Sequence, residues 1–273
     1  MPSCWKVGEQ SNIGRCRIKR HKRSKKPCRI LPTTNFLHSF YLDSRFKLEK
    51  MSPKLYGSDM NEGVRAVLLT ARALNVEVLV VDVNIFSKDN VEKELVKINP
   101  DYTIPTLVDE DFISWDTHAI LSHLVDKYSS SDALYPKESK DQVAQKLMFE
   151  SDTLRPRVDS IIQATVVENE KEIPTEKISA ITEAYKQLNN FLENKNYLTG
   201  DSLTIADLCC VATVSTATVI TPISTEKYPN LSQWYRTCKN LDYYEEANGV
   251  GLNKLDALVE QKLGRPRIKE LCE

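Results

Sequence analysis

The segment Asn99-Pro100-Asp101-Tyr102-Thr103-Ile104-Pro105-Thr106-Leu107, followed by Trp115-Asp116-Thr117-His118-Ala119-Ile120, decides how the first part of this chain folds. Proline has no N–H to donate to a sheet, so a proline that opens an apolar strand needs a special backbone geometry. A cis bond between Ile104 and Pro105 supplies that geometry, because it turns the chain and leaves the N–H and C=O of Ile104 facing outward. An exposed backbone pair of this kind can bind the backbone of a small peptide as an added strand would.

A helix is predicted to begin at Asp116 and Thr117, eleven residues after Pro105. The first N–H groups of a helix lack partners within the helix and attract carboxylates. The two segments together therefore predict a receptor for a small, charged peptide.

Strands and helices alternate in residues 51–130. Short strands are expected at residues 54–57, 76–83, 105–108 and 112–114, with helices after the first strand and at 116–128 and a polar helix or turn at residues 89–98. The second strand, VEVLVVDV, is rich in β-branched residues and nearly continuous in apolarity, which is typical of a covered parallel strand. The expected order of this unit is βαβ-α-ββα.

Residues 131–139 form a predicted linker, and beyond it the patterns indicate helices only. One long helix is expected around residues 147–165, with a bend at Pro156. In Gly200-Asp201-Ser202-Leu203-Thr204-Ile205-Ala206-Asp207, Thr204 and Asp207 have the spacing of a capping box, with Leu203 and Leu208 as its hydrophobic staple. We expect an all-helical domain at residues 140–263 and a tail at 264–273.

The chain of 273 residues has room for two domains. No apolar run reaches the roughly 18 residues of a membrane span, so no membrane association is expected. The seven cysteines do not have the spacing of a disulfide framework or of a metal site, and Cys209 and Cys210 lie in an apolar helical stretch. These features favour the cytoplasm and a protein without metal.

Charge divides the chain at about residue 50. Residues 1–50 hold 13 Lys and Arg against 3 Asp and Glu, whereas residues 51–273 hold 24 against 35. The basic arm is predicted to be disordered. It is interpreted as a polyanion-binding or nuclear-localisation tail, as an organelle-targeting presequence, or, the reading we favour, as a variable extension before a usual start at Met51. Nucleic acid is not an expected partner, because the remainder of the chain is acidic.

These motifs, together with the start Met51-Ser-Pro-Lys-Leu-Tyr-Gly, resemble those of cytosolic glutathione transferases, and above all their insect delta/epsilon branch. The resemblance covers essentially all of residues 54–263. It implies an α+β fold in which a thioredoxin-like domain precedes an all-helical one. It also implies a homodimer that uses glutathione as co-substrate and conjugates it to small hydrophobic electrophiles.

The chain departs from this family where the sulfur of glutathione would lie. A thiolate is the nucleophile in such chemistry, and one hydrogen-bond donor at a helix N-terminus can stabilise it. The family pattern places a serine there, and this chain has Asn61. Asn61 can donate through its NH₂ group, or it can act only as a helix N-cap. Ser58 and Tyr56 are the alternative donors.

The other glutathione contacts follow from the resemblance. Asp116 is expected to pair with the amino group of the γ-glutamyl unit, and Thr117 with its carboxylate. His118 is interpreted either as a further contact or as a structural histidine. The remaining glutathione-binding residues are expected to be Asn90, Tyr102, Thr103, Ile104 and Pro105; Asn90 and Tyr102 stand where the family has histidines.

The pocket for the electrophile is expected in the helical domain, around Phe149, Thr153, Leu154 and Arg157, and Tyr235 or Tyr243 are further candidates. The opposing hypothesis is a protein that holds glutathione or an apolar ligand on the same scaffold with little catalysis. The missing serine distinguishes these two readings only in part, because a helix N-terminus alone contributes about 0.3–1 kcal/mol.

Overall fold

The computed structural model describes residues 52–83 and 95–264. The basic arm, Asn90 and the tail after Gly264 lie outside this range, and predictions that concern them are not tested. Within it, the first part of the chain runs in the order β1 (Lys54–Gly57), α2 (Glu62–Ala73), β2 (Leu79–Asp82), a helical turn at residues 95–98, β3 (Thr106–Asp109), β4 (Phe112–Ser114) and α4 (Thr117–Tyr128). This is the predicted βαβ-α-ββα order.

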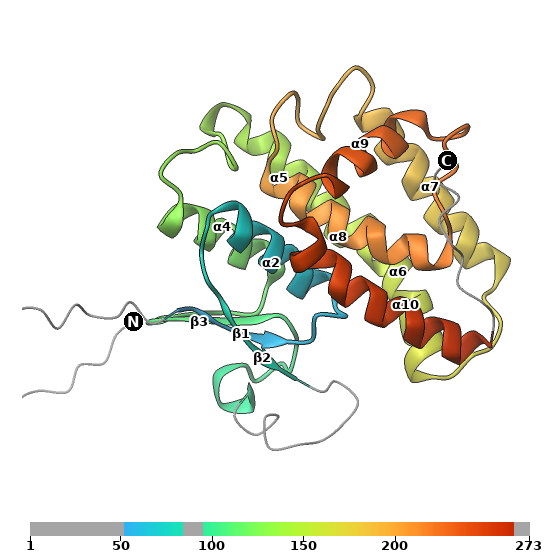
Figure 1. Cartoon of the computed structure of the whole chain (residues 1–273), viewed down its shortest axis with the longest axis horizontal. Helices are drawn as coiled ribbons and strands as arrows, with labels where there is room; N and C mark the ends of the chain where they lie inside the picture. Colours follow the sequence, from blue (N-terminus) through green and yellow to red (C-terminus); the bar gives the residue numbers. More distant parts are fainter. Residues whose placement is uncertain (1–51, 84–94, 265–273) are drawn as a thin grey trace, which may run out of the picture. The chain divides into compact units, whose positions relative to one another are not determined.

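The four strands form one mixed sheet in the order β2-β1-β3-β4. β1 pairs in parallel with β2, whereas β3 pairs antiparallel with β1 and with β4. Helices α2 and α4 lie together on one face of the sheet, as Figure 1 shows. Leu55 and Leu107 from the strands and Val64 and Leu121 from the helices are fully buried between these layers.

The second strand differs from its prediction. It covers Leu79–Asp82 rather than residues 76–83, and Leu79 is 53% and Val80 39% exposed. β2 is an edge strand with a single neighbour, so its apolar residues have less cover than the β-branched run predicted. The apolarity of this run did not reveal that the strand lies at the edge of the sheet.

Helices alone make up the second part, and Figure 1 shows them packed beside α2. They are α5 (Lys140–Phe149), α6 (Arg155–Ile162), α7 (Thr175–Phe191), α8 (Ile205–Ile220), α9 (Pro229–Lys239) and α10 (Val250–Leu263). α8 is apolar on nearly all sides and lies at the centre of the helices. Its most extensive packing is against α2. Its cysteines Cys209 and Cys210 are free and buried, as predicted. No described helix is long and apolar enough to cross a membrane.

The start of α8 carries the predicted capping box. The Asp207 carboxylate accepts hydrogen bonds from the N–H and hydroxyl of Thr204 (both 2.9 Å), from the N–H of Leu198 (2.8 Å) and from the indole of Trp234 (2.9 Å). Burial raises the pKa of Asp207, and these hydrogen bonds oppose the rise. The capping residue thus also ties α9 and the chain before α8 to the helix start.

The predicted bend in the long helix takes a particular form. Between α5 and α6 lies a π-helical turn, η3 (Glu150–Leu154), where the N–H of Arg155 donates to the carbonyl of Glu150 five residues back. Pro156 occupies the first turn of α6 and has no N–H for the regular ladder. A π turn inserts one extra residue, so every side chain after it faces about 100° away from the direction that a continuous helix predicts.

Candidate functional site

The two motifs that decide the fold meet at the beginning of α2. A Cβ atom placed on Gly63 would lie 2.8 Å from Oγ1 of Thr117, 2.9 Å from Cδ of Pro105 and 3.1 Å from Oδ1 of Asn61. The Ile104-Pro105 bond is cis, as predicted. Only a residue without a side chain fits this junction, which brings together two helix N-termini and the turn before β3. The site is thus built from three separate stretches of the chain.

Asn61 is the N-cap of α2. Its Oδ1 accepts the N–H of Val64 at 3.1 Å, and its backbone lies in the extended region that an N-cap needs. The Nδ2 group of the same amide makes no hydrogen bond within the described part of the chain. One amide can therefore cap the helix with its oxygen and still offer a donor to a ligand.

The two alternative donors are placed less favourably. Ser58 is buried in the turn after β1, where its hydroxyl accepts the N–H of Met60 at 3.4 Å. Tyr56 precedes Gly57, where an added Cβ atom would meet Val64 in the first turn of α2 and Ile104 in the turn before β3. Because side chains alternate along a strand, Tyr56 is directed to the face of the sheet opposite α2.

The turn before β3 presents the backbone of Ile104. Within the described residues, neither its N–H nor its C=O makes a hydrogen bond. Asn99 is fully buried and holds the turn, since its Nδ2 group donates to the carbonyl of Thr103 (2.8 Å) and to the hydroxyl of Thr106 (2.9 Å). Tyr102 has a positive φ of 63° and is 40% exposed. The turn is therefore fixed from inside while the backbone of Ile104 faces outward.

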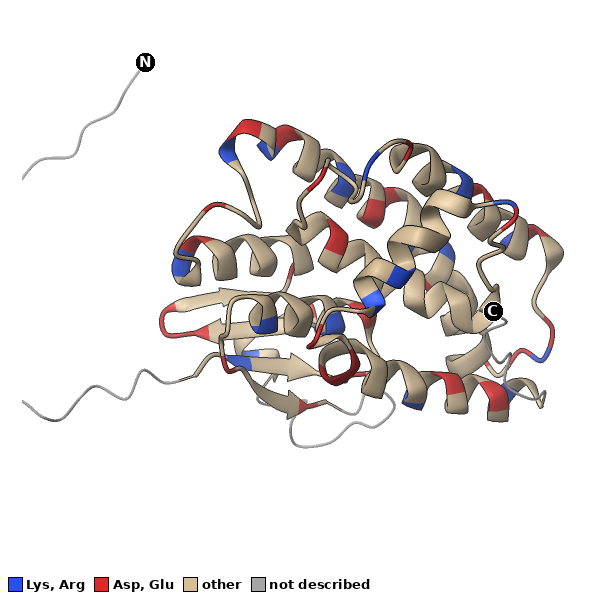
Figure 2. Ribbon diagram, turned by 45° about the horizontal axis from the view of Figure 1, so that its top comes forward, with Lys and Arg blue, Asp and Glu red and all other residues tan. Residues whose placement is uncertain are grey.

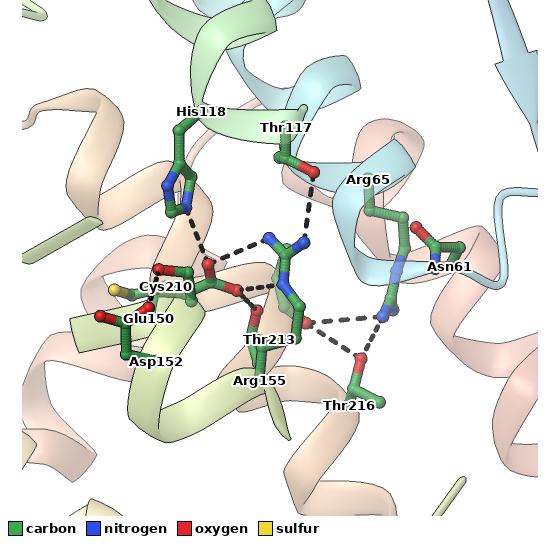
Figure 3. Close-up of polar contacts among 12 residues, drawn as sticks. Asn61, Arg65, Thr117, His118, Glu150, Asp152, Arg155, Cys210, Thr213 and Thr216 are labelled. Atoms are coloured by element: carbon green, nitrogen blue, oxygen red, sulfur yellow. Dashed lines mark hydrogen bonds and ion pairs between the residues drawn. The ribbon is translucent and has the colours of Figure 1, made fainter. Parts of the chain in front are cut away.

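Asp116 and Thr117 open α4 as predicted. Asp116 is exposed, and its Oδ1 caps the helix by accepting the N–H of Ala119 at 2.8 Å. Thr117 is buried and accepts a hydrogen bond of 3.3 Å from Nη1 of Arg155. His118 points away from the junction, toward Glu150, as Figure 3 shows. The structure thus supports the interpretation of His118 as a structural residue.

Glu150, on the π turn, has no exposed surface and is surrounded by donors (Figure 3). It accepts from Nε2 of His118 (2.8 Å), from Nε and Nη2 of Arg155 (2.9 and 3.0 Å) and from the hydroxyl of Thr213 (2.6 Å). Burial acts to raise the pKa of Glu150, but the hydrogen bonds from His118, Arg155 and Thr213 and the charge of Arg155 outweigh it and lower that pKa to about 2. This carboxylate ties α4, α6 and α8 together.

A second carboxyl group, Asp159, lies three residues beyond Pro156 on α6 and is half-buried. Burial raises the pKa of Asp159 to about 8, and the negative charge and hydrogen bond of Glu62 add to that effect. Glu62 directly follows Asn61 and is buried. The sequence analysis missed Arg155 and Asp159; their i, i+4 spacing on one helix face was the available signal.

The residues predicted to line the electrophile pocket make contacts with other helices, and their role in a pocket stays a prediction. Phe149 packs edge-on against Phe191 of α7, and Nη1 of Arg157 donates to the carbonyl of Ala180 in the same helix. Leu154 is fully buried in the core, and Thr153 is half-buried. These residues flank or lie on the π turn η3, which sets the direction of the side chains that follow it. Tyr235 is buried and Tyr243 half-buried near α9.

Comparison with known proteins agrees with this architecture. Residues 51–126 match the family model of the glutathione S-transferase N-terminal domain, and residues 124–242 match that of the C-terminal domain. Glutathione S-transferase 1 of Manduca sexta is 36% identical over 213 residues, which are 77% of this chain and 98% of that protein.

Solved structures give the same result. An epsilon-class glutathione S-transferase from the housefly, Musca domestica, is 39% identical, with a TM-score of 0.75 over 77% of this chain and 98% of its own. A glutathione transferase homologue from Drosophila mojavensis with bound glutathione is 36% identical, with a TM-score of 0.74 over 77% of this chain and 97% of its own. The chain belongs to the glutathione S-transferase family.

Proposed function

We propose that this protein conjugates glutathione to hydrophobic electrophiles, and that Asn61 replaces the usual serine as the donor to the glutathione sulfur. The observation that carries this proposal is the junction at Gly63, where Asn61, Pro105 and Thr117 converge. The free Nδ2 group of Asn61 and the N-terminus of α2 are donors at one point, and the outward backbone of Ile104 is available for the cysteinyl unit of glutathione.

Binding of the γ-glutamyl unit is assigned to the start of α4. Asp116 is exposed and negative, which suits the amino group, and the hydroxyl of Thr117 with the helix N-terminus suits the carboxylate. Thr103 and Tyr102 flank the backbone of Ile104, and Asn90 is proposed for the glycine end. We also propose a homodimer in the cytoplasm, which analytical ultracentrifugation and cell fractionation test.

The thiol is the decisive group to measure. The ultraviolet absorbance of the thiolate, followed from about pH 5 to pH 10 with the full-length chain, gives the pKa of bound glutathione. We expect that pKa to fall below the 8.5 or so of a free cysteine thiol. Asn61→Ala should remove most of the decrease and Asn61→Ser should restore it, whereas Asn240→Ala, a change at an exposed residue after α9, should leave it unaltered.

A second candidate function is storage of glutathione or of an apolar ligand. The observation in its favour is Glu62, a carboxyl group within one residue of Asn61 that opposes a neighbouring thiolate. Saturable binding of glutathione with an unchanged thiol pKa in the same titration would favour storage and contradict conjugation.

A further inference from the structure

Arg155, the first residue of α6, reaches the start of α4 from the helical part of the molecule. Its Nη1 donates to Oγ1 of Thr117 at 3.3 Å, and its Nε and Nη2 hold the carboxylate of Glu150 at 2.9 and 3.0 Å. Glu150 in turn accepts from Nε2 of His118 at 2.8 Å. The ion pair therefore contacts two consecutive residues in the first turn of α4, as Figure 3 shows, and fixes the guanidinium relative to that turn.

The hydroxyl of Thr117 lies at the junction of the three stretches that build the site. Its oxygen would be 2.8 Å from a Cβ atom on Gly63, so it faces the start of α2 while it accepts from Arg155. A hydroxyl has one proton to donate. Within the described residues, the buried hydroxyl of Thr117 donates that proton to no acceptor. Arg155 thus leaves Thr117 as a hydrogen-bond donor directed at a ligand.

The charge beside this hydroxyl is permanent. Burial acts to lower the pKa of Arg155, but the charge and hydrogen bonds of Glu150 outweigh it and raise that pKa above its ordinary value. The guanidinium side chain is 23% exposed, so it is near the surface that a ligand would occupy. A hydroxyl that accepts from a cation is polarised and becomes a stronger donor to an anion.

The two sides of this helix start carry opposite charge. Asp116 is exposed and caps α4, whereas the cation of Arg155 lies behind the next residue, Thr117. An amino acid presents an ammonium and a carboxylate on one carbon atom. The arrangement therefore suits the α-carbon end of a γ-glutamyl unit, with its ammonium toward Asp116 and its carboxylate toward Thr117.

Resting on the proposed function, we propose that Arg155 is a positioning residue for glutathione, which orients the hydroxyl of Thr117 toward the γ-glutamyl carboxylate. It thereby makes the protein selective for thiol peptides that carry this carboxylate. A peptide without the carboxylate leaves the polarised donor unpaired, and an unpaired buried donor weakens binding. The helical part of the chain thus contributes to a subsite whose other residues all come from the first part.

Two peptides isolate the contribution of that carboxylate. γ-Aminobutyryl-cysteinylglycine has the thiol, the amino group and the glycine carboxylate of glutathione, with hydrogen in place of the γ-glutamyl carboxylate. The ratio of the two affinities reports on the carboxylate subsite alone, because damage to the fold or to the turn before β3 weakens both peptides. Isothermal titration calorimetry with the full-length chain measures both affinities without any need for conjugation.

The wild-type protein should bind glutathione at least about 10-fold more tightly than the aminobutyryl peptide, since hydrogen bonds to a charged group are among the stronger ones. Arg155→Met should weaken glutathione by about 10-fold or more and leave the aminobutyryl peptide within about threefold. Arg72→Met is the matched control, because Arg72 also pairs with a glutamate, Glu246, but lies on the surface. It should change neither affinity.

Variants of Thr117 test whether Arg155 acts through the hydroxyl. Thr117→Val removes the hydroxyl with little change of shape and should lower the selectivity as much as Arg155→Met does. Once Thr117 is valine, Arg155→Met should have little further effect on selectivity, because the two residues act as one unit. Thr117→Ser retains a hydroxyl and should retain the selectivity. Additive losses in the double variant would overturn the positioning role.

The design also separates this role from stability. Arg155→Met leaves Glu150 buried without its cation, so a second variant replaces both residues by methionine and removes the buried ion pair as a whole. It should show the same loss of selectivity. Equal weakening of both peptides in these variants, or a wild type that does not distinguish the peptides, would overturn the inference.

The proposed function fails in a different way. Selective binding of glutathione without conjugation would contradict conjugation and retain the role of Arg155. Absence of measurable glutathione binding by the wild-type protein would overturn both.

Discussion

Glu150 and Asp159 lie nine residues apart on one bent helical segment; Glu150 is fully buried and Asp159 is half-buried. Yet the pKa of Glu150 is lowered to about 2, while that of Asp159 is raised to about 8. Burial favours the neutral acid in both cases. The opposite shifts of the two pKa values come from the charged and polar groups around each carboxyl group.

Glu150 accepts hydrogen bonds from a guanidinium, an imidazole and a hydroxyl, so its charged form has enough donors to replace water. Burial and the negative charge of Glu62 both raise the pKa of Asp159, so its neutral form is the favoured one. The same segment thus contains a permanent anion that holds helices together and a carboxylic acid that can exchange a proton. Figure 2 shows acidic residues on many of the helices around them, and these two differ from exposed acids in what they contact.

The largest effect is expected when the anion is removed. Glu150→Gln leaves Arg155 half-buried without its carboxylate and directs an amide NH₂ toward donors. Breaking one side of a buried ion pair typically costs about 3–5 kcal/mol. We expect a loss of this size in the free energy of unfolding, measured with urea at neutral pH. Glu168→Gln, an exposed change, should stay within about 0.5 kcal/mol. A loss below 1 kcal/mol or so would mean that the Glu150 contacts contribute little.

The pH dependence of stability should separate the two carboxyl groups. Asp159 has a folded pKa above its ordinary 3.8, so its contribution to stability is complete below that value and is lost as the pH rises through about 8. Glu150 has a folded pKa below its ordinary 4.5, so its contribution is present above that value and is lost as the pH falls toward about 2.

Asp159→Asn should therefore stabilise the protein relative to wild type at about pH 9 more than at about pH 5. We expect a difference of roughly 3 kcal/mol, with allowance for partial exposure of Asp159, from urea unfolding at the two pH values. Equal stability differences at both values would show that Asp159 does not titrate between them and would remove the contrast with Glu150.

Asp207 offers an intermediate case, since its four hydrogen bonds come from neutral donors only. Asp207→Asn directs an NH₂ group at some of those donors and leaves buried N–H groups unpaired, at a cost of about 1–3 kcal/mol. The free energy of unfolding should fall less than in Glu150→Gln. Asp201→Asn, an exposed neighbour, serves as the control. A cost equal to that of Glu150→Gln would show that partner charge is not what distinguishes the two sites.

The sequence predicted the features that depend on local chemistry. The turn before β3, the caps of α4 and α8 and the order of the strands follow from Pro105, Asp116, Thr204 and the apolar periods. Each of these signals depends on residues that are close together in the sequence, so it can be recognised from the sequence alone. The exposure of Leu79 and Val80 depends on the place of β2 in the sheet, which no local pattern encodes.

The side-chain contacts on the helical side of the molecule could not be predicted from the sequence for a related reason. Arg157 contacts α7 and Leu154 lies in the core, and the bend expected at Pro156 takes the form of a π turn that the sequence pattern did not predict. The turn depends on how Glu150 is satisfied by side chains from α4 and α8, which are distant in the sequence. Contacts between side chains that are distant in the sequence can be identified only when the fold is known.

The smallest expected effect concerns the cap that places Glu62. Asn61→Ala removes the side-chain acceptor for the N–H of Val64, and loss of an N-cap costs about 1 kcal/mol. Asn61→Ser keeps an acceptor at the same position and should retain most of the stability. Urea unfolding at neutral pH measures both variants.

The effect of this cap on Asp159 refines the comparison with Glu150. If the first turn of α2 loosens in Asn61→Ala, the negative charge of Glu62 acts less strongly on Asp159, and the pKa of Asp159 should fall toward its ordinary value. Glu150 receives its donors from α4, α6 and α8 and not from α2, so its low pKa should be unaffected. Carboxyl-carbon NMR of the variant follows both groups in one titration. A parallel shift of the two would mean that the N-terminus of α2 influences the whole polar interior rather than the carboxyl pair alone.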